Sequence, residues 1–330
     1  MSSSAKVTAL VRLGQYLSGN DSDLQIVKDR AFQANGWFTP EFIDLSLQNI
    51  CRYYLDESRL NEWLAAYTAP VSSPRQVGIV AAGNIPLVGF HDWLCGFLSG
   101  HQVRLKLSSK DTILMQHVID KVKEWYPEYA EQTQVQDILK NCDAYIATGS
   151  NNSARYFEYY FAKYPHIIRR NRTSVAVLDG TETATELEAL ADDVMLYFGL
   201  GCRNVTSIFV PENYDFEALL KALRKYSYLA DHHKYKNNYD YNLALVLLSN
   251  TAYLTNDNII LQESAAVFSP ISVLHYSYYT DAAMLREELK GNNDLQCIVG
   301  HGFTPFGMAQ QPSLSDYADG VDTMQFLTGL

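Results

Sequence analysis

The spacing of apolar residues changes along the chain and divides it into regions of different structure. Residues 1 to about 70 have helical periodicity, in which apolar side chains recur every three or four positions, as at Phe42, Leu45, Leu47, Ile50 and Tyr54. A loop rich in proline and serine at residues 69–74 predicts the end of this region. From residue 76 onward, short apolar runs alternate with helical patterns, which is typical of α/β proteins.

Four apolar runs between residues 76 and 179 predict strands. They read QVGIVAAG, VRLKL, DAYIATGS and TSVAVLD. Helical patterns separate them, one through Trp93 and Leu98, one at residues 111–125 with Asp111 as its expected cap, and one at residues 155–164. This alternation favours a doubly wound, largely parallel sheet. We therefore expect N-terminal helices and a Rossmann-like nucleotide-binding domain at residues 1–178.

The second half of the chain repeats the alternation less regularly. A helix at residues 183–198 places Leu187, Leu190 and Val194 on one face, and the strand NVTSIFV follows it. Next come a helix near residues 214–229, a polar connection DHHKYKNNYDY, a strand ISVLHYSYY, a helix at residues 281–290 and a strand LQCIVG. These elements predict a second α/β domain at residues 179–330.

Composition excludes several classes of function. The 330 residues are 47% hydrophobic, which is enough apolar material for two domain cores. The formal net charge of -11 argues against a nucleic-acid surface or an anionic membrane surface, because both require clustered Lys and Arg. No apolar stretch has the length of a transmembrane helix or the position of a signal peptide. Five scattered cysteines favour a reducing compartment, so we expect a cytoplasmic protein.

Cys202 lies where the helix at residues 183–198 gives way, through Gly199 and Gly201, to a strand. A thiol directly after these glycines is open to a substrate, and the glycines let backbone amides approach an oxyanion. The partly negative end of the preceding helix opposes ionisation of the thiol, which leaves Arg203 or a bound substrate to activate it. Free cysteines are more often small buried apolar side chains, a description that fits Cys51, Cys95 and Cys297.

Polar residues follow three of the predicted strands, and the carboxyl ends of parallel strands share the edge where ligands bind. Asn84 follows the first strand and can donate to an oxyanion, although it can equally form an ordinary turn before Pro86. The second strand ends in hydroxyls and cations that suit ribose and phosphate, at Lys106, Ser108, Ser109 and Lys110. The third ends at Thr148, Gly149 and Ser150, whose amides can face a pyrophosphate or serve as a plain helix cap.

Several common signatures are absent from the sequence. There is no G-x-G-x-x-G after a strand, no G-x-x-x-x-G-K-[ST] and no G-x-S-x-G. His232 and His233 beside Asp231 have no third ligand at a suitable spacing, so we interpret this segment as a solvated loop and expect no metal site.

The order of these segments resembles the aldehyde dehydrogenase superfamily. The resemblance is closest to its fatty acyl-CoA reductase branch, which includes the reductase component of the bacterial luminescence fatty-acid system, and it covers roughly residues 76–330. The run VGIVAAGNIPLVGF is similar to the strand and turn that supply the oxyanion amide, which implies this role for Asn84. The run YFGLGCRNVTSIFV resembles the catalytic-cysteine segment and implies that Cys202 is the nucleophile.

The resemblance also implies a cofactor site. VRLKLSS is similar to the strand whose lysine touches the adenosine ribose, and ATGS is similar to the turn beside the cofactor. VFSPISVLHY resembles the segment whose phenylalanine lies near the nicotinamide, and PFGMAQQPSL resembles a C-terminal stretch of the family. The implied cofactor residues are Ala82, Gly83, Lys106, Ser108, Ser109, Lys110, Thr148, Gly149, Ser150 and Phe268.

Departures from the family pattern indicate the direction of the reaction. Hydrolytic aldehyde dehydrogenases have a water-activating glutamate where this chain reads HIIRRNRTSV, without a carboxylate, which favours exchange with coenzyme A and reduction. The glutamate that contacts the ribose 2′-hydroxyl is replaced by Ser109, followed by Lys110, which favours NADPH over NADH. Ala266 replaces another glutamate, with Glu263 nearby, in the segment expected to contact the nicotinamide ribose.

Together these features predict NADPH-dependent reduction of an acyl-CoA thioester to an aldehyde through a covalent acyl-cysteine on Cys202. A related acyl-phosphate or semialdehyde oxidoreductase would share Cys202 and Asn84. A catalytically silent scaffold subunit of an acyl-activating complex would share neither activity nor cofactor. The expected partners are an acyl-CoA substrate, an acyl-activating enzyme and a second copy of the chain.

Overall fold

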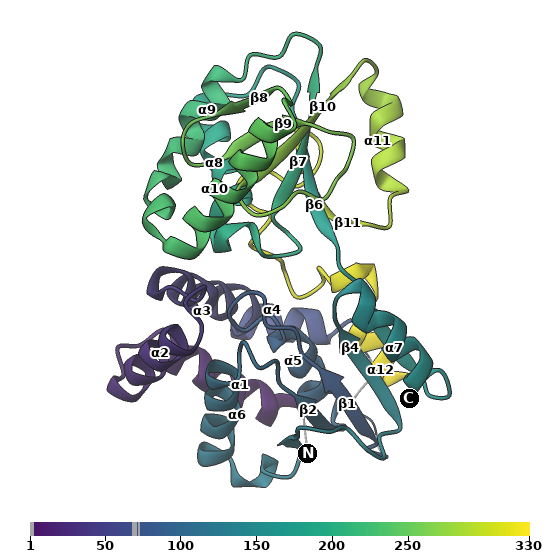
Figure 1. The fold of residues 1–330 in the computed structure, drawn as a ribbon. Helices are drawn as coiled ribbons and strands as arrows, with labels where there is room; N and C mark the ends of the chain where they lie inside the picture. Colours follow the sequence, from purple (N-terminus) through teal and green to yellow (C-terminus); the bar gives the residue numbers. More distant parts are fainter. Residues whose placement is uncertain (1–2, 68–70, 72) are drawn as a thin grey trace. The chain divides into compact units, whose positions relative to one another are not determined.

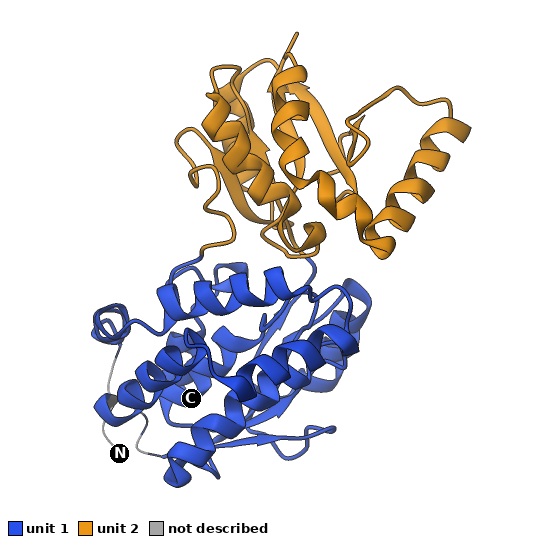
Figure 2. Ribbon diagram, turned by 90° about the vertical axis from the view of Figure 1, so that its left-hand side faces the viewer, with its two compact units in different colours: residues 1–171, 312–330 blue, residues 172–311 orange. Residues whose placement is uncertain are grey.

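The structure is a computed structural model that describes residues 3–67, 71 and 73–330. The chain divides into two compact units, unit 1 at residues 1–171 and 312–330 and unit 2 at residues 172–311 (Figure 2). The sequence predicted that the first domain ends at residue 178 and that residues 312–330 belong to the second. In the structure the first segment of unit 1 ends at residue 171, and residues 312–330 return to unit 1. The loop expected at residues 69–74 falls partly outside the described residues.

Unit 1 is built on a parallel sheet with the strand order β3-β2-β1-β4-β5 (Figure 1). Its strands are β1 (Gln76–Val80), β2 (Gln102–Lys106), β3 (Thr133–Val135), β4 (Ala144–Thr148) and β5 (His166–Arg169). Three of the four predicted strands are confirmed here as β1, β2 and β4. The fourth, TSVAVLD, belongs to the sheet of unit 2 instead. The edge strands β3 and β5 were missed, because three or four residues are too short for a clear apolar alternation.

Helices cover both faces of this sheet. The helices of unit 1 are α1 (Ser3–Leu17), α2 (Ser22–Ala34), α3 (Pro40–Tyr54), α4 (Glu57–Leu64), α5 (Phe90–Ser99), α6 (Ile113–Trp125), α7 (Asn151–Phe161) and α12 (Thr323–Thr328), with short 3₁₀ turns at η1 (Pro127–Tyr129) and η4 (Ala318–Gly320). On one face, a Cβ at Gly96 of α5 would lie only 2.7 Å from Val103 of β2. On the opposite face Tyr145 of β4 stacks on Phe161 of α7, with ring centroids 3.9 Å apart.

A buried ion pair attaches the C-terminal segment to unit 1. Arg169, at the end of β5, is 2% exposed and contacts Asp92 of α5 at 2.7 Å. Its guanidinium also donates to the Thr323 hydroxyl at 2.7 Å and to the carbonyl of Ala318. Helix α12 packs on α5. Through these two hydrogen bonds, Arg169 holds residues 318–323 in place. Removing Asp92 would leave the charge of Arg169 buried and unpaired.

Unit 2 contains a second sheet with the strand order β11-β6-β7-β10-β9-β8, parallel except for β8 (Figure 1). Its strands are β6 (Thr173–Val177), β7 (Val205–Pro211), β8 (Tyr253–Thr255), β9 (Ile260–Glu263), β10 (Val273–Tyr279) and β11 (Leu295–Gly300). The sequence predicted β7, β10 and β11 and missed β8 and β9. Two α/β units with largely parallel sheets confirm the predicted fold class.

The helices of unit 2 contain one clear correction. They are α8 (Ala184–Met195), α9 (Glu217–Leu223), α10 (His233–Leu248) and α11 (Ala282–Lys290), with 3₁₀ turns at η2 (Leu196–Gly199) and η3 (Arg224–Asp231). The segment expected as a polar, solvated connection forms most of α10. Its buried stripe consists of Tyr235, Tyr239, Asn242 and Val246, so the helical spacing is present but is formed by two tyrosines and an asparagine with one aliphatic residue.

The structure also bears on the membrane prediction. Among residues 3–67, 71 and 73–330, no helix has both the length and the apolar character needed to cross a bilayer. No disulfide joins any two of the five cysteines, all of which lie in the described residues.

Candidate active site

Asn84 lies at the point where the strand order of unit 1 reverses. Strand β1 has β2 on one side and β4 on the other. The connection after β1 leads to β2 on one side, and the connection after β4 leads to β5 on the other side. Asn84 follows β1, and Thr148 is the last residue of β4. Ligands of open α/β sheets bind at this reversal, outside the carboxyl ends of the strands.

The segment that carries Asn84, here called the Asn84 turn (residues 83–89), is fixed by three contacts. Leu87 has a left-handed backbone (φ 57°), and its amide donates to the Asp111 carboxylate at 2.6 Å. The Ser46 hydroxyl donates to the Pro86 carbonyl at 2.7 Å. A Cβ at Gly89 would lie 2.7 Å from that of Ala81, so only glycine allows the turn to close so tightly.

Asp111 has a different role from the predicted one. The sequence suggested that it caps the helix at residues 111–125, but α6 begins at Ile113 and its N-cap, Thr112, forms no side-chain cap bond. The Asp111 carboxylate binds the Leu87 amide instead, and its other oxygen has no hydrogen-bond partner among the described residues. Burial raises the pKa of Asp111 to about 7, and the hydrogen bond from Leu87 partly opposes this.

The residues expected to bind the cofactor adenosine lie at the same edge of the sheet. A Cβ at Gly83 would lie 2.5 Å from the Ser108 hydroxyl oxygen, so residues 83 and 108 are in close contact. Lys106, the last residue of β2, is opposite Val80 of β1 and is exposed, as are Ser109 and Lys110. Ala82 lies just before Gly83. Ser108 therefore contacts a glycine at the strand reversal, and exposed hydroxyl and cationic side chains follow at the same edge.

The turn after β4 is engaged mainly in the fold. The Ser150 hydroxyl accepts from the Ser153 amide at 3.3 Å and caps α7, as the plainer interpretation of the sequence expected. The Gly149 amide donates to the Arg169 carbonyl at 3.2 Å, within the pairing of β4 with β5. The Gly149 amide is therefore satisfied within the protein.

The segment that carries Cys202, here called the Cys202 turn (residues 197–204), reverses the chain before β7. Helix α8 ends at Met195, three residues earlier than predicted. Tyr197 and Phe198 then take left-handed backbones (φ 54° and 57°), followed by Gly199 (φ 74°). Left-handed residues other than glycine are strained, and the burial of both aromatic rings in the core offsets that strain.

Cys202 is half-buried at the amino end of β7. The Ser174 hydroxyl of β6 donates to its carbonyl at 3.1 Å. The neighbouring cation, Arg203, donates to the Ala309 carbonyl at 3.4 Å. Buried Asp193 accepts from the Gly307 and Ala309 amides at 2.7 and 2.9 Å, and burial raises its pKa to about 7. Residues 307–309 are thus tied to α8.

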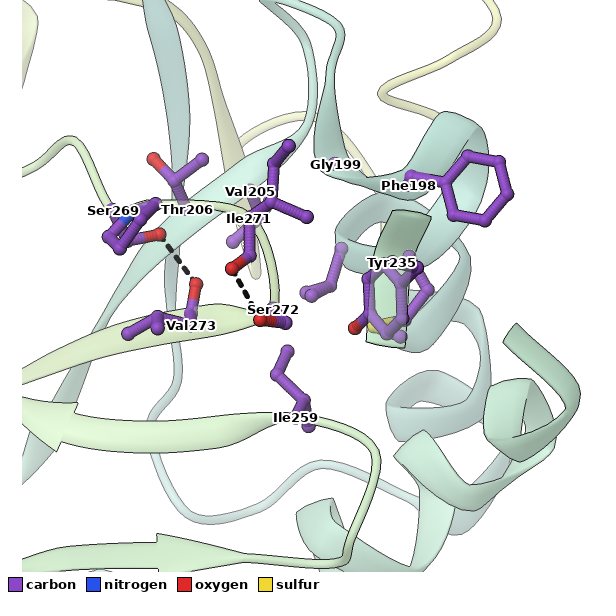
Figure 3. Close-up of a pocket in the computed structure, with 13 residues that line it drawn as sticks. Phe198, Gly199, Val205, Thr206, Tyr235, Ile259, Ser269, Ile271, Ser272 and Val273 are labelled. Atoms are coloured by element: carbon purple, nitrogen blue, oxygen red, sulfur yellow. Dashed lines mark hydrogen bonds between the residues drawn. The ribbon is translucent and has the colours of Figure 1, made fainter. Parts of the chain in front are cut away.

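Phe268 belongs to a segment that lies beside the start of β7. The Thr206 hydroxyl donates to the carbonyl of Val267 at 2.6 Å, and His275 contacts the Ala266 carbonyl through Nδ1 at 2.8 Å. A small cavity of about 20 Å³ lies under the Cys202 turn (Figure 3). Its wall includes residues on both sides of the turn and in the core, among them Phe198, Gly199, Val205, Thr206, Tyr235, Ile259 and Ser272.

Two histidine segments have structural roles. His232, expected in a solvated loop, accepts from the Tyr235 amide at the start of α10 and packs on Phe198 at 4.6 Å between ring centroids. His301 contacts Asp179 at 2.8 Å and Glu186 at 3.0 Å, and these hydrogen bonds raise its pKa to about 9. Asp179, Glu182 and His301 have ligand atoms within 4.8 Å of one another. His301 contacts one carboxylate through each ring nitrogen, so in this structure the group is an ion-pair cluster.

Sequence reasoning did not identify the side chains that hold the two turns, chiefly Asp111 and Asn204. Asp111 had been given another role, and Asn204 has no motif around it. Their partners are distant in sequence or are backbone atoms, so no residue pattern indicates them.

Comparison with solved structures shows that the two units form the fold of the aldehyde dehydrogenases. An NAD-dependent benzaldehyde dehydrogenase from Corynebacterium glutamicum is 10% identical, with a TM-score of 0.65 over 91% of this chain and 76% of that chain. An aldehyde dehydrogenase from Bacillus cereus in complex with NAD⁺ is 13% identical, with a TM-score of 0.63 over 91% and 72%.

The sequence assigns the family within that fold. The model of the acyl-CoA reductase (LuxC) family matches residues 52–231, which is more than half of the chain. The chain belongs to this family of acyl-CoA reductases. A comparison with curated protein sequences found no match.

Proposed function

We propose that the protein reduces an acyl-CoA thioester to an aldehyde with NADPH, through a covalent acyl-cysteine on Cys202. Family membership supports the reaction class. The observation that most supports the covalent route is the placement of Cys202, a half-buried thiol on a turn whose backbone is fixed by hydrogen bonds. Such a fixed geometry is what a nucleophile needs.

In the first half of the reaction, the Cys202 thiolate attacks the thioester carbonyl and the bond to coenzyme A breaks. Negative charge develops on the carbonyl oxygen, and the Asn84 amide donates to it. The Cys202 amide is the second proposed donor. The Gly201 carbonyl accepts from the Asn204 amide at 3.0 Å, and in a trans peptide the Cys202 N–H points the opposite way from that carbonyl, outward from the turn.

In the second half, the acyl-thioester on Cys202 accepts a hydride, becomes a thiohemiacetal and releases the aldehyde when its C–S bond breaks. A nicotinamide cofactor supplies that hydride when bound. The chain fits such a group, because Gly83 lets the ends of β1 and β2 approach closely, with Ser108 against it, at the strand reversal of unit 1 where ligands of such sheets bind. The NAD⁺ in the Bacillus cereus structure supports a nicotinamide cofactor here.

The residues proposed to hold the adenosine and phosphates are Ala82, Gly83, Lys106, Ser108, Ser109, Lys110, Thr148, Gly149 and Ser150, with Phe268 near the nicotinamide. The exposed cation of Lys110 beside Ser109 supports NADPH, because a 2′-phosphate gains an ion pair and meets no carboxylate at position 109. Because the Gly149 amide already donates to the Arg169 carbonyl, the hydroxyls of Thr148 and Ser150 are the better candidates for binding the cofactor phosphates at the end of β4.

The absence of a water-activating carboxylate supports reduction over hydrolysis. Residues 166–175 contain no Asp or Glu. Two arginines of this stretch are paired with acids from helices, Arg169 with Asp92 and Arg170 with Glu158. The residue of this stretch that contacts Cys202 is Ser174, a hydroxyl. Without a carboxylate there as general base for water, the acyl group remains available for hydride transfer.

The test follows NADPH consumption with acyl-CoAs of graded chain length. We expect wild-type protein to consume NADPH with at least one chain length and Cys202→Ala to lose that activity. Cys51→Ala is the matched control, because Cys51 is also a half-buried cysteine but lies in α3 of unit 1. Equal rates in wild type and Cys202→Ala would contradict the proposal.

A further inference from the structure

Asn204 is a fully buried side chain two residues after Cys202. Its carboxamide oxygen accepts from the Gly201 amide at 2.7 Å. Its nitrogen donates to the carbonyls of Leu196 at 2.8 Å and Asp193 at 3.1 Å, with a longer contact to Val194 at 3.4 Å. One neutral side chain therefore joins the end of α8 to the Leu200–Gly201 peptide, one residue before Cys202.

The backbone on both sides of Cys202 is fixed by this arrangement. The Gly201 N–H donates to the Asn204 side chain, and the Gly201 carbonyl accepts from the backbone N–H of Asn204 at 3.0 Å, which completes the same turn. On the other side, the Ser174 hydroxyl donates to the Cys202 carbonyl at 3.1 Å. Peptide planes are rigid, so fixing the planes before and after a residue fixes the direction of its Cα–Cβ bond. The backbone therefore fixes the point from which the thiol projects, and rotation about the Cα–Cβ bond sets the final position of Sγ.

The same carboxamide also changes the electrostatics of the turn. The last carbonyls of a helix lack intrahelical partners and carry partial negative charge, which opposes a nearby thiolate. The amide hydrogens of Asn204 bind these carbonyls at the end of α8. A carboxamide has the donors and the acceptor that this position requires and adds no charge beside Cys202.

We propose that Asn204 is the positioning residue for the Cys202 nucleophile: it holds the backbone from which the thiol projects and shields the thiolate from the negative end of α8. This inference rests on the proposed function of Cys202. It assigns to Asn204 no contact with substrate or cofactor. Ser174 assists from the other side by holding the Cys202 carbonyl.

The test measures alkylation of Cys202 by iodoacetamide as a function of pH, read by peptide mass spectrometry without substrate or cofactor. We expect Asn204→Ala to slow alkylation at neutral pH and to move the half-maximal rate to higher pH. We also expect kcat for acyl-CoA reduction to fall about 10-fold to 100-fold, with a smaller change in KM, because a small displacement of the nucleophile has effects of this size. Asn204→Asp should move the profile further, since it adds a negative charge.

Asn242→Ala is the matched control. Asn242 is also buried in unit 2, and its nitrogen also donates to two carbonyls, those of Asn238 and Ile271, but it lies in α10. Both alanine variants should lower the unfolding temperature, and only Asn204→Ala should change the Cys202 alkylation profile. If the two variants lose similar stability and both keep the wild-type profile, Asn204 is merely structural and the proposal is overturned.

Ser174→Ala decides the question if Asn204→Ala does not fold. It removes a single hydroxyl, and we expect the same change in the alkylation profile at smaller amplitude. A wild-type profile in that variant would overturn the proposal. Failure of the proposed function gives a different result, in which Cys202→Ala keeps full reductase activity whatever the alkylation profile shows.

Discussion

The Asn84 turn and the Cys202 turn are held by opposite means. The Asn84 turn follows a strand and lies at the carboxyl edge of its sheet, whereas the Cys202 turn precedes a strand and lies at the amino edge. A buried, ionisable carboxylate from Asp111 holds the first through the Leu87 amide. A neutral carboxamide from Asn204 and a hydroxyl from Ser174 hold the second.

This difference separates a turn that depends on pH from one that does not. Asp111 accepts one amide bond, its second oxygen has no partner among residues 3–67, 71 and 73–330, and burial raises its pKa to about 7. The carboxamide of Asn204 and the hydroxyl of Ser174 that hold the backbone of the Cys202 turn do not titrate near neutral pH, and the carboxylate of Asp193 reaches the turn through residues 307–309. We therefore expect the geometry of the proposed oxyanion donor to respond to pH near neutrality, and the backbone around the thiol to stay constant.

The largest expected effect follows from removing the proposed donor of the Asn84 turn. Asn84→Ala should lower kcat by about 10² to 10³ with little change in KM, because an oxyanion donor acts mainly in the transition state. Steady-state rates with a reactive acyl-CoA give both constants. Ser46→Ala is the companion variant, since it loosens the turn at Pro86 and keeps the amide, and its loss should be smaller. An unchanged kcat in Asn84→Ala would remove Asn84 from the mechanism.

The preference for NADPH over NADH tests whether Ser109, at the sheet edge beside the Asn84 turn, faces the adenosine ribose. Ser109→Glu places a carboxylate where the 2′-phosphate is expected, so the ratio of kcat/KM with NADPH to that with NADH should fall about tenfold or more. Ser109→Gln serves as the control, because glutamine has nearly the same size as glutamate but carries no charge. If both variants keep the wild-type ratio, position 109 does not face the ribose.

The pH dependence of stability tests the ionisable support directly. The native pKa of Asp111 is raised from 3.8 to about 7, so its favourable contribution is complete below the unfolded value and is lost as pH rises through about 7. Between these values, stability should fall by at most about 1.4 kcal/mol per pH unit for this one group. Asp111→Asn should flatten the curve measured by urea unfolding from pH 5 to pH 8.

Asp193→Asn is the matched variant in unit 2, because Asp193 is also buried with its pKa raised to about 7. Asp193→Asn should likewise reduce the fall in the free energy of unfolding between pH 5 and pH 8, by the part that Asp193 contributes. If the wild-type slope persists in Asp111→Asn, the carboxyl is ionised throughout this range and the comparison of the two turns fails.

The smallest expected effect concerns the cavity under the Cys202 turn. Val205→Ile adds one methylene beside a space of about 20 Å³, so the free energy of unfolding should change by less than about 1.5 kcal/mol. The alkylation profile of Cys202 should be unchanged, because hydrogen bonds rather than the cavity wall set the turn. A shift as large as that of Asn204→Ala would show that packing controls the thiol.

The sequence predicted the fold where apolar spacing was clear and failed where it was not. Strands β1, β2 and β4 contain enough apolar residues to be recognised, whereas β3 and β5 are too short. Helix α10 was missed because its buried stripe includes Tyr235, Tyr239 and Asn242. TSVAV was assigned to the wrong sheet, because periodicity does not show which strands pair.

The candidate site was predictable only in its reactive groups. A lone thiol after two glycines and an asparagine after a strand are visible in the sequence. Their supports are not, because Asp111 binds an amide 24 residues away and Asn204 binds helix carbonyls up to 11 residues earlier. Such hydrogen bonds to the backbone place no requirement on the identity of the partner residue, so they leave no sequence pattern.

The central claim is that Cys202 carries the acyl group, and the most direct measurement is mass spectrometry of the protein after incubation with an acyl-CoA in the absence of cofactor. We predict one added acyl group, located on the peptide that contains Cys202, and its release as an aldehyde when NADPH is added. Aldehyde formation without an adduct on Cys202, or with the acyl group on another residue, would contradict the account.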